Sequence, residues 1–265
     1  PLEDKNLSSH KVDKWCEQRF EVVQMMWGIG ARQPGDNSFE SVIFKSHSLH
    51  SKIKALDLSV GLGKSARFLV NDHFMTVDGI ECNPQILEKC HALNNKLDVA
   101  RYIKLLDFDL ENINLPKMSY DLIYSREKLH LMKYKKPILA NCSDALRAKG
   151  KIVFTDFILT EEDHEEELKD NWAETEKHTL HLVTKEYYYN TFQKMHLKCI
   201  PPYDLSMQYI TQVYEGWQRT KENFKKNPPT KEIMEIAAFE TKLWRSRVDA
   251  ILAGHMKLLL FQMLR

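Results

Sequence analysis

The sequence predicts an α/β protein whose core is a doubly wound, mostly parallel sheet of seven strands. Three observations lead to this prediction. Short apolar segments alternate with amphipathic segments between residues 52 and 159, as strands and helices do in such a sheet. A glycine-bearing turn directly follows the first apolar segment. The chain has 265 residues, which is enough for one large domain of this class.

Five strands are expected in the first part of the chain, and helices should connect them. The expected strands are residues 52–59, 74–81, 100–107, 120–125 and 150–159. The expected helices are residues 62–70, 83–96 and 136–150. Asn83 and Pro84 are typical of a helix start, and Gly150 is expected to end the third helix in the left-handed conformation. This alternation favours parallel strands joined by right-handed crossovers.

The flanking segments favour helices around this core. Residues 9–27 repeat apolar side chains at helical spacing, and a turn-rich stretch follows at 28–38. Beyond residue 160 the expected order is an acidic helix (160–178), a helix (184–196), a sixth strand (197–206), helices within 207–253 broken near 227–230, and a final strand (255–264).

The helical excursion before the final strand predicts a cap over the carboxyl edge of the sheet, where ligands of open α/β sheets bind. We therefore interpret residues 1–265 as a single domain. Its expected parts are an N-terminal helical segment (1–50), the ligand-binding core (51–160), a helical region with the sixth strand and the cap (161–254), and the last strand (255–265).

Composition narrows the classes of function. The chain has 38 Lys and Arg against 37 Asp and Glu, so its net charge of +1 gives no bulk attraction to nucleic acid or to an anionic membrane. No apolar run is long enough for a bilayer span, and the first residues lack a secretory pattern. The five scattered cysteines favour reduced thiols and a cytoplasmic protein. His178 and His181 lack the companions of a zinc site, so we expect no metal.

The turn after the first strand reads Asp57-Leu58-Ser59-Val60-Gly61-Leu62-Gly63 and leads into a helix. Glycines at such a turn let a ligand approach the backbone, and the first N–H groups of the helix point toward that ligand. A Gly-x-Gly pair alone is also common in ordinary tight turns. Its place between a strand and a helix makes it a candidate ligand site.

Two carboxylates strengthen this interpretation. Glu81 ends the second expected strand, eighteen residues after Gly63, where an acid can accept both ribose hydroxyls of a nucleoside. Its alternative role is a favourable charge near the next helix N-terminus. Asp109 follows the third strand and can accept an adenine amino group, with Asp107 as a competitor for that role. Either aspartate can also be an ordinary loop residue.

Together these elements resemble the class I S-adenosylmethionine (SAM)-dependent methyltransferases, which have a Rossmann-like sheet. The resemblance rests on ALDLSVGLG (55–63), GIE (79–81), DLENINLPKMSYDLIYS (109–125) and ALRAKGKIVFTDF (145–157). Ser59 stands where the family usually has glycine. The resemblance implies SAM as the cofactor, and it implies the following binding residues: Asp57, Ser59, Gly61, Gly63, Glu81, Cys82, Asp109, Leu110 and Ser125.

Residues 120–137 further resemble the phosphoethanolamine N-methyltransferases and related small-molecule methyltransferases, and residues 27–36 are similar to their N-terminal lid. This resemblance implies methyl transfer to a small molecule at an amine nitrogen. Two departures stand out. Ala31 replaces the lid tyrosine that pairs with the catalytic histidine. Phe157, Leu180 and His178 replace the residues that grip the phosphate, so a phosphobase substrate does not follow.

Four residues are candidates for the acceptor side. His130 follows the fourth strand and is the expected general base, because histidine titrates near neutral pH. Its alternative is a half-buried structural histidine. Arg126 can anchor an acidic acceptor or pair with Glu127 or another acid. Trp27 and Tyr124 can line an aromatic pocket for a cationic amine or belong to the core.

Two other functions remain open from the sequence. One is a catalytically inactive SAM-binding regulatory or partner subunit, which Ser59 and Ala31 motivate. The other is an NAD-dependent oxidoreductase on a related sheet. A nucleic-acid methyltransferase is disfavoured by the charge balance. We expect a small-molecule substrate, no nucleic-acid or membrane partner, and a monomer or homodimer.

Overall fold

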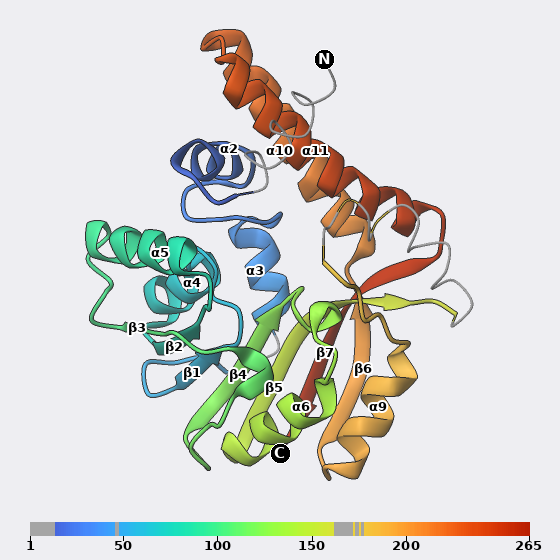
Figure 1. Ribbon diagram of the computed structural model, residues 1–265. Helices are drawn as coiled ribbons and strands as arrows, with labels where there is room; N and C mark the ends of the chain where they lie inside the picture. The colour runs from blue at the N-terminus through green and yellow to red at the C-terminus, as the bar shows by residue number, and fades with distance from the viewer. Residues whose placement is uncertain (1–13, 46–47, 162–171, 173–174, 176–177) are drawn as a thin grey trace.

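A seven-stranded mixed sheet forms the centre of the computed structural model, which describes residues 14–45, 48–161, 172, 175 and 178–265 (Figure 1). The strand order is β3-β2-β1-β4-β5-β7-β6. The strands are β1 (Lys54–Asp57), β2 (Thr76–Ile80), β3 (Ile103–Leu106), β4 (Tyr120–Arg126), β5 (Leu146–Leu159), β6 (Lys198–Asp204) and β7 (Met256–Leu264).

The first five strands run parallel, and β7 pairs antiparallel with both β5 and β6. The sequential order of the strands reverses beside β1, because β1 pairs with β2 on one side and with β4 on the other. In doubly wound sheets this reversal opens a crevice at the carboxyl ends of the strands. The predicted fold class is therefore confirmed, and the topology places a ligand crevice next to the turn that follows β1.

Helices cover both faces of the sheet (Figure 1). They are α2 (Glu17–Trp27), α3 (Asn37–Phe44), α4 (Lys64–His73), α5 (Pro84–Lys96), α6 (Lys135–Ala145), α9 (Lys185–Lys194), α10 (Ser206–Lys226) and α11 (Lys231–Leu252). Neighbouring strand residues alternate between the two cores: Val153 joins the core that holds α2 to α4, and Phe154 joins the core of α6 and α9. Within the described residues, no helix is both long and apolar enough to cross a bilayer.

The boundary between α6 and β5 differs from the expectation. Helix α6 ends at Ala145, not at Gly150, and Leu146 already pairs with Tyr120 of β4. The register then shifts before Lys151 pairs with Leu122, so residues 147–150 form an irregularity within one strand. Gly150 therefore lies inside β5. The sequence predicted that Gly150 would end the helix. Pairing of Leu146 with β4 instead begins the strand four residues before this glycine.

Other expected boundaries hold with small shifts. Helix α4 begins at Lys64 because Gly63 adopts a left-handed φ of 87° and precedes the helix. Asn83 caps α5 as expected, accepting a hydrogen bond from the Ile86 N–H at 3.1 Å. The first residues of the expected N-terminal helix and most of the expected acidic helix (160–178) lie outside the described residues.

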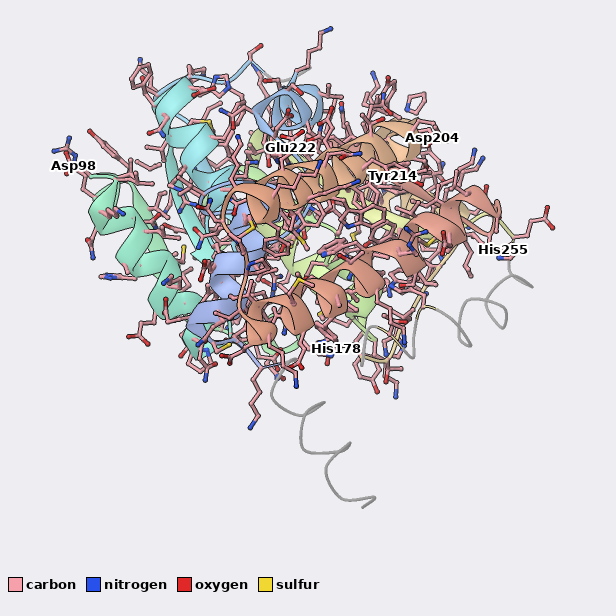
Figure 2. The ribbon with its side chains drawn as sticks, turned by 90° about the horizontal axis from the view of Figure 1, so that it is seen from above. Asp98, His178, Asp204, Tyr214, Glu222 and His255 are labelled. Carbon is pink, nitrogen blue, oxygen red and sulfur yellow. The ribbon has the colours of Figure 1, made fainter. Side chains whose placement is uncertain are left out.

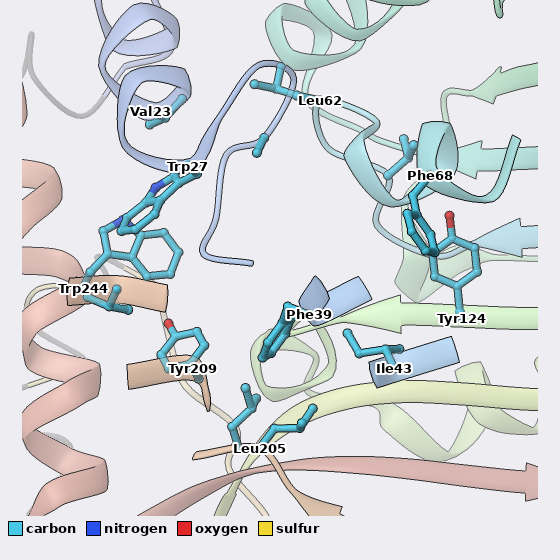
Figure 3. Packing of buried hydrophobic residues seen from close by; sticks show 14 of the residues in the cluster. Val23, Trp27, Phe39, Ile43, Leu62, Phe68, Tyr124, Leu205, Tyr209 and Trp244 are labelled. Atoms are coloured by element: carbon cyan, nitrogen blue, oxygen red, sulfur yellow. The ribbon is translucent and has the colours of Figure 1, made fainter. Parts of the chain in front are cut away.

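The two longest helices, α10 and α11, lie side by side above the sheet and pack on α2 (Figure 2). Trp27, the last residue of α2, meets Trp244 of α11 edge-on with ring centroids 5.3 Å apart (Figure 3). Gly216 of α10 brings that helix against the same indole. A Cβ atom at this glycine would lie 2.2 Å from Trp27 Cζ3. The predicted cap thus packs on the N-terminal helix through large aromatic side chains.

Gly216→Ala should destabilise the chain by about 1–3 kcal/mol, although alanine is the better helix former. The added Cβ cannot fit unless α10 moves away from Trp27. Urea unfolding would measure this loss, and Trp27→Leu in the same chain should recover part of it by making room. Equal losses in the single and double variants would show that this contact does not set the helix spacing.

Candidate active site

The turn between β1 and α4 uses its two glycines differently. Gly61 has a left-handed φ of 54°, and a Cβ there would lie 2.8 Å from Nε of Arg32. A Cβ on Gly63 would instead lie 2.6 Å from Nη1 of Arg67 and 2.9 Å from Sγ of Cys90. Gly61 therefore opens the turn toward the crevice. Gly63 permits close packing of the turn on α4 and α5, rather than the approach of a ligand.

A cleft of about 410 Å³, which includes space open to solvent, lies at the carboxyl ends of β1, β2 and β3. We call it the strand-end cleft. Five of the predicted binding residues line it: Ser59, Glu81, Cys82, Asp109 and Leu110. Asp107 does not line it, so the structure places Asp109 on the cleft wall in preference to its competitor.

Both carboxylates of the strand-end cleft are held by local hydrogen bonds. Glu81 Oε1 accepts from the Asn83 N–H at 2.9 Å. Asp109 caps the short helix η1 (Leu110–Asn112), with Oδ1 accepting from the Glu111 N–H at 3.1 Å. A carboxylate has about four lone-pair positions, so each side chain can still accept bonds from a ligand. These local bonds fix the direction in which each acid presents its oxygens.

A second cavity, the turn cavity, has a volume of about 350 Å³ and lies against the β1–α4 turn. Asp57, Ser59, Gly61 and Arg126 are among its lining residues. Burial raises the pKa of Asp57 to about 7, although a hydrogen bond from the Ser59 N–H opposes this shift. A buried carboxylate at the end of β1 is a natural partner for a cationic group of a ligand.

Four predicted residues do not line these cavities. Gly63 packs against α4 and α5, and Ser125 is buried behind Ser59, with their hydroxyl oxygens 3.3 Å apart. Trp27 belongs to the core beneath α10 and α11 (Figure 3). Tyr124 packs edge-on against Phe44 in that core, with centroids 5.3 Å apart. The predicted aromatic pocket of Trp27 and Tyr124 is therefore a packing feature, because both rings are covered by helices.

The guanidinium of Arg126 is bonded to groups of the protein itself. Its Nη1 pairs with Glu40 Oε1 at 2.6 Å, and its Nη2 lies 3.5 Å from Glu127 Oε2. Nη2 also donates to the carbonyl of Pro34 at 2.7 Å. Of the two interpretations that the sequence left open, pairing with acids is the one observed. The buried partner Glu40 was missed, although an acid within the otherwise apolar pattern of residues 39–44 is a signal for it.

The lid, residues 27–36, is fastened to the core by three cations that donate to its backbone carbonyls. The pairs are Lys64 with Trp27 and Gly35, Arg67 with Gly30, and Arg126 with Pro34. Burial lowers the pKa of Lys64 to about 8, and the nearby Glu40 opposes this shift. These bonds hold the lid down over the turn cavity.

His130 is almost fully buried beside β5, where Asp156 fixes its orientation. Asp156 Oδ1 lies 2.9 Å from Nδ1 of His130 and accepts from its backbone N–H at 3.0 Å. Asp156 Oδ2 accepts from the Tyr188 hydroxyl at 2.6 Å. The carboxylate favours a proton on Nδ1 and leaves the lone pair on Nε2. Nε2 is buried and has no hydrogen-bond partner among the described residues.

A third space, the large cavity, has about 1090 Å³ including open solvent, and His130 lines it. Aromatic side chains from the cap, Phe239 and Trp244, form part of its wall. Arg32 lines all three spaces, and Lys128 lines both the strand-end cleft and the large cavity. The three spaces therefore meet at the lid. Sequence reasoning missed Arg32 and Lys128, because neither belongs to a periodic or spaced motif.

Comparison with known proteins finds a family match within the core of the sheet. Residues 56–154 match the family model described as "Methyltransferase domain". These residues form a methyltransferase domain. The match supports the SAM-dependent methyltransferase and the SAM cofactor that the sequence resemblance implies. The oxidoreductase alternative is set aside by this match, which spans the β1–α4 turn and strands β2 to β4.

Its relatives are named for small-molecule substrates. The chain is 24% identical over 216 residues to phosphoethanolamine N-methyltransferase of Plasmodium falciparum, covering 79% of each chain. It is 27% identical over 108 residues to a sarcosine/dimethylglycine N-methyltransferase of Aphanothece halophytica, covering 41% of this chain and 39% of that protein.

Solved structures share the fold. Phosphoethanolamine N-methyltransferase 2 of Haemonchus contortus, in complex with phosphomonomethylethanolamine and S-adenosylhomocysteine, superposes with a TM-score of 0.78 at 16% identity. The match covers 96% of this chain and 59% of that one. A sarcosine dimethylglycine methyltransferase described as putative, from Galdieria sulphuraria, gives a TM-score of 0.71 at 17% identity, covering 86% and 84%.

The residues of the site fit SAM chemically. Glu81 and Asp109 supply acceptors for hydroxyl and amino groups in one cleft, and Asp57 supplies a buried acid in the adjoining cavity. The raised pKa of Asp57 indicates a carboxylate that lacks full compensation for its burial. An ammonium group is the complement of that acid. SAM carries all of these groups.

Asp57→Asn should stabilise the chain at high pH while weakening its affinity for SAM. The pKa of Asp57 is raised from 3.8 to about 7, so its stability contribution is complete below about pH 4 and is lost as pH rises through 7. Asparagine never ionises. The stability of the variant relative to wild type should therefore rise by roughly 2–3 kcal/mol between about pH 5 and about pH 8 in urea unfolding. A constant difference across that range would contradict the account.

Proposed function

We propose that this chain transfers the methyl group of SAM to the amine nitrogen of a small molecule, with His130 as the general base. One observation carries the proposal. The buried Nε2 of His130 has no hydrogen-bond partner among the described residues, and His130 is one of the residues that line the large cavity. A buried imidazole nitrogen without a partner is costly unless it serves a ligand. The adjoining strand-end cleft is where we place the adenosine of SAM.

Bound SAM supplies a methyl group on a sulfonium sulfur, and this sulfur leaves as a neutral thioether. The residues of the chain have two tasks in this transfer. They hold the acceptor nitrogen in line with the methyl carbon, which contributes roughly 7–11 kcal/mol in well-aligned systems. They also remove one proton from an acceptor that arrives as an ammonium ion, so that its lone pair forms the new N–C bond.

His130 Nε2 takes that proton. Asp156 prepares it by holding Nδ1, so that the basic lone pair is left on Nε2, and it stabilises the imidazolium that forms. Phe157 and Trp172 pack against the imidazole, with ring centroids 5.2 and 5.4 Å away, and exclude water from it. The Tyr188 hydroxyl positions Asp156 by donating to its other carboxylate oxygen, Oδ2. This assigns His130 a role that does not require the lid tyrosine replaced by Ala31.

Three features support an amine acceptor. Glu127 lies on the wall of the large cavity and offers a carboxylate to an ammonium group. Trp244 and Phe239 line the same cavity, and aromatic faces favour cations. The relatives from Plasmodium falciparum and Aphanothece halophytica are both named as N-methyltransferases. Phe157 and Leu180 are buried and do not line the large cavity. We therefore assign them no role in binding a phosphate group.

The test is a methyl-transfer assay with SAM and a panel of primary, secondary and tertiary amines. The proposal expects S-adenosylhomocysteine to form together with a methylated amine. Micromolar binding of S-adenosylhomocysteine by calorimetry, without turnover on any amine, would instead favour a non-catalytic SAM-binding subunit. Turnover restricted to alcohols or thiols would retain the methyltransferase and overturn the amine acceptor.

A further inference from the structure

Lys135 is a buried lysine at an unfavourable position in the fold. It is the first residue of α6, and only 2% of its surface is exposed. The positive end of the helix macrodipole lies at this point, so a cation is disfavoured there. Burial of an ammonium group adds a further cost unless the protein forms hydrogen bonds to it. Helix formation alone therefore does not account for this lysine.

The ammonium group of Lys135 joins two backbone segments. Its Nζ donates to the carbonyl of Met132 at 2.7 Å and also to the carbonyl of His181. Met132 directly follows the short helix η2 (Leu129–Leu131), which carries His130. His181 donates its own backbone N–H to the carbonyl of His130 at 2.7 Å. Lys135 thus ties together the two segments that hold the backbone of His130.

Two carboxylates act on Lys135 through space. Burial lowers the pKa of Lys135 to about 8, and Asp156 on β5 and Glu111 on η1 oppose this shift. Asp156 is also the residue that contacts Nδ1 of His130. Tyr188, which donates to Asp156 from α9, stays protonated because burial raises its pKa well above 10. One carboxylate therefore interacts with both the Lys135 ammonium group and the His130 imidazole.

Further charged side chains line the large cavity together with His130, among them Glu127, Lys128, His178 and Arg247. Arg247 on α11 also lies over the two rings that pack on the imidazole, Phe157 and Trp172, at 5.8 Å from each centroid. These groups stay the same when Lys135 is replaced. A comparison of Lys135 variants therefore isolates the effect of this one cation.

The charges of Asp156 and Lys135 act on the imidazole in opposite directions. The carboxylate favours the imidazolium, and an imidazole that already carries two protons cannot act as a base. The ammonium group disfavours the imidazolium, because like charges repel. Asp156 alone would orient His130 but would also promote its protonation. The nearby cation reduces that second effect and leaves the orientation intact.

We propose that Lys135 is a positioning residue for His130, which braces the backbone of the base and offsets the charge of Asp156, so that the imidazole is neutral when the acceptor arrives. This proposal rests on the proposed function, in which His130 is the base. Lys135 lines none of the strand-end cleft, the turn cavity and the large cavity. It acts on the reaction only through His130.

The first measurement is an NMR titration of the histidine side chains in the full chain, with the His130 signal assigned by its absence from the His130→Ala chain. Lys135→Met removes the charge, so the midpoint of the His130 titration should rise by about half a pH unit or more. Lys135→Arg keeps the charge and should leave the midpoint within about 0.2 units of wild type. This measurement requires no acceptor.

The second measurement is the pH–rate profile on the best amine of the panel. On the acidic limb, kcat of Lys135→Met should be about threefold or more below wild type, because half a pH unit corresponds to that factor. The difference should narrow above about pH 8, where Lys135 of the wild-type chain loses its own charge. KM should change less than kcat, and Lys135→Arg should recover most of the loss.

Lys136→Met is the matched control, because it removes an exposed cation from the same turn of α6. It should leave both the His130 midpoint and kcat at wild-type values. Urea unfolding of each variant checks that the chain is folded. If Lys135→Met does not fold, Lys135→Gln takes its place, since it is also neutral and keeps an N–H donor for a carbonyl.

Three results would overturn the proposal: a wild-type His130 midpoint in the neutral variant, equal midpoints in the neutral and Lys135→Arg variants, or a loss of kcat by the same factor at every pH. The last result would mean that Lys135 only supports packing. Failure of the proposed function looks different, because the wild-type chain would then produce no methylated amine while the His130 midpoint still responded to Lys135.

Discussion

Replacing His130 by alanine should lower kcat by about 10²–10⁴-fold and leave the affinity for S-adenosylhomocysteine unchanged. The expected loss follows from the geometry around the imidazole. Nδ1 is occupied by Asp156, and Nε2 is buried at the wall of the large cavity without a partner among the described residues. The chain would lose its proton acceptor but keep Glu81 and Asp109. Single-turnover kinetics and calorimetry would measure the two quantities separately.

Two further variants make this prediction specific. His178→Ala removes an exposed histidine that lines the same cavity, and it should have a much smaller effect on kcat. Asp156→Asn should act through His130, because an amide no longer stabilises the imidazolium. Its pH–rate profile should shift along with the fall in kcat, which a purely structural role for Asp156 would not produce. Wild-type turnover by the His130 variant at every pH would remove His130 from the mechanism.

Glu81→Ala should weaken the binding of SAM and S-adenosylhomocysteine by about 10²-fold or more. Glu81 stands at the end of β2 with one carboxylate oxygen free of the Asn83 N–H. We place both ribose hydroxyls on this acid, and a hydrogen bond to a charged group is worth about 1.5–3 kcal/mol. Two such bonds correspond to at least a hundredfold in affinity. Calorimetric titration of the purified variant would measure the change.

A nucleoside without the amino-acid end separates the roles of Glu81 and Asp57. Methylthioadenosine keeps the ribose and lacks the ammonium group, so Glu81→Ala should weaken it by the same factor as S-adenosylhomocysteine. Asp57→Asn should weaken S-adenosylhomocysteine and spare methylthioadenosine. Glu88→Ala, an exposed acid on α5, is the control and should change neither affinity. Wild-type affinities in the Glu81 variant would show that the ribose lies elsewhere.

Local patterns in the sequence were sufficient to predict most of the sheet. The strands β1 to β5 are short apolar runs between helices, and parallel strands buried on both faces are expected to have this composition. The order at the far edge was not predictable in the same way, because β7 inserts between β5 and β6 through contacts distant in sequence. The misplaced end of α6 has a similar cause, since pairing with β4 outweighs the local preference of Gly150.

The candidate site shows the same division. Ser59, Glu81, Cys82, Asp109 and Leu110 line one cleft because strand ends in a parallel sheet converge on one edge. The roles of Trp27 and Tyr124 could not be predicted, because aromatic side chains occur in both cores and ligand pockets. In the structure, both side chains belong to the buried core under the helices. Arg32 reaches the site from the lid, a segment far from the strand ends in the sequence pattern.

The most direct measurement is a crystal structure of the chain with S-adenosylhomocysteine bound. The account predicts the ribose hydroxyls on the Glu81 carboxylate, the adenine amino group toward Asp109, and the ammonium group against Asp57. The sulfur should face the large cavity beside His130. The nucleoside found outside the strand-end cleft, or bound there with Glu81 turned away from the ribose, would contradict the placement on which the mechanism depends.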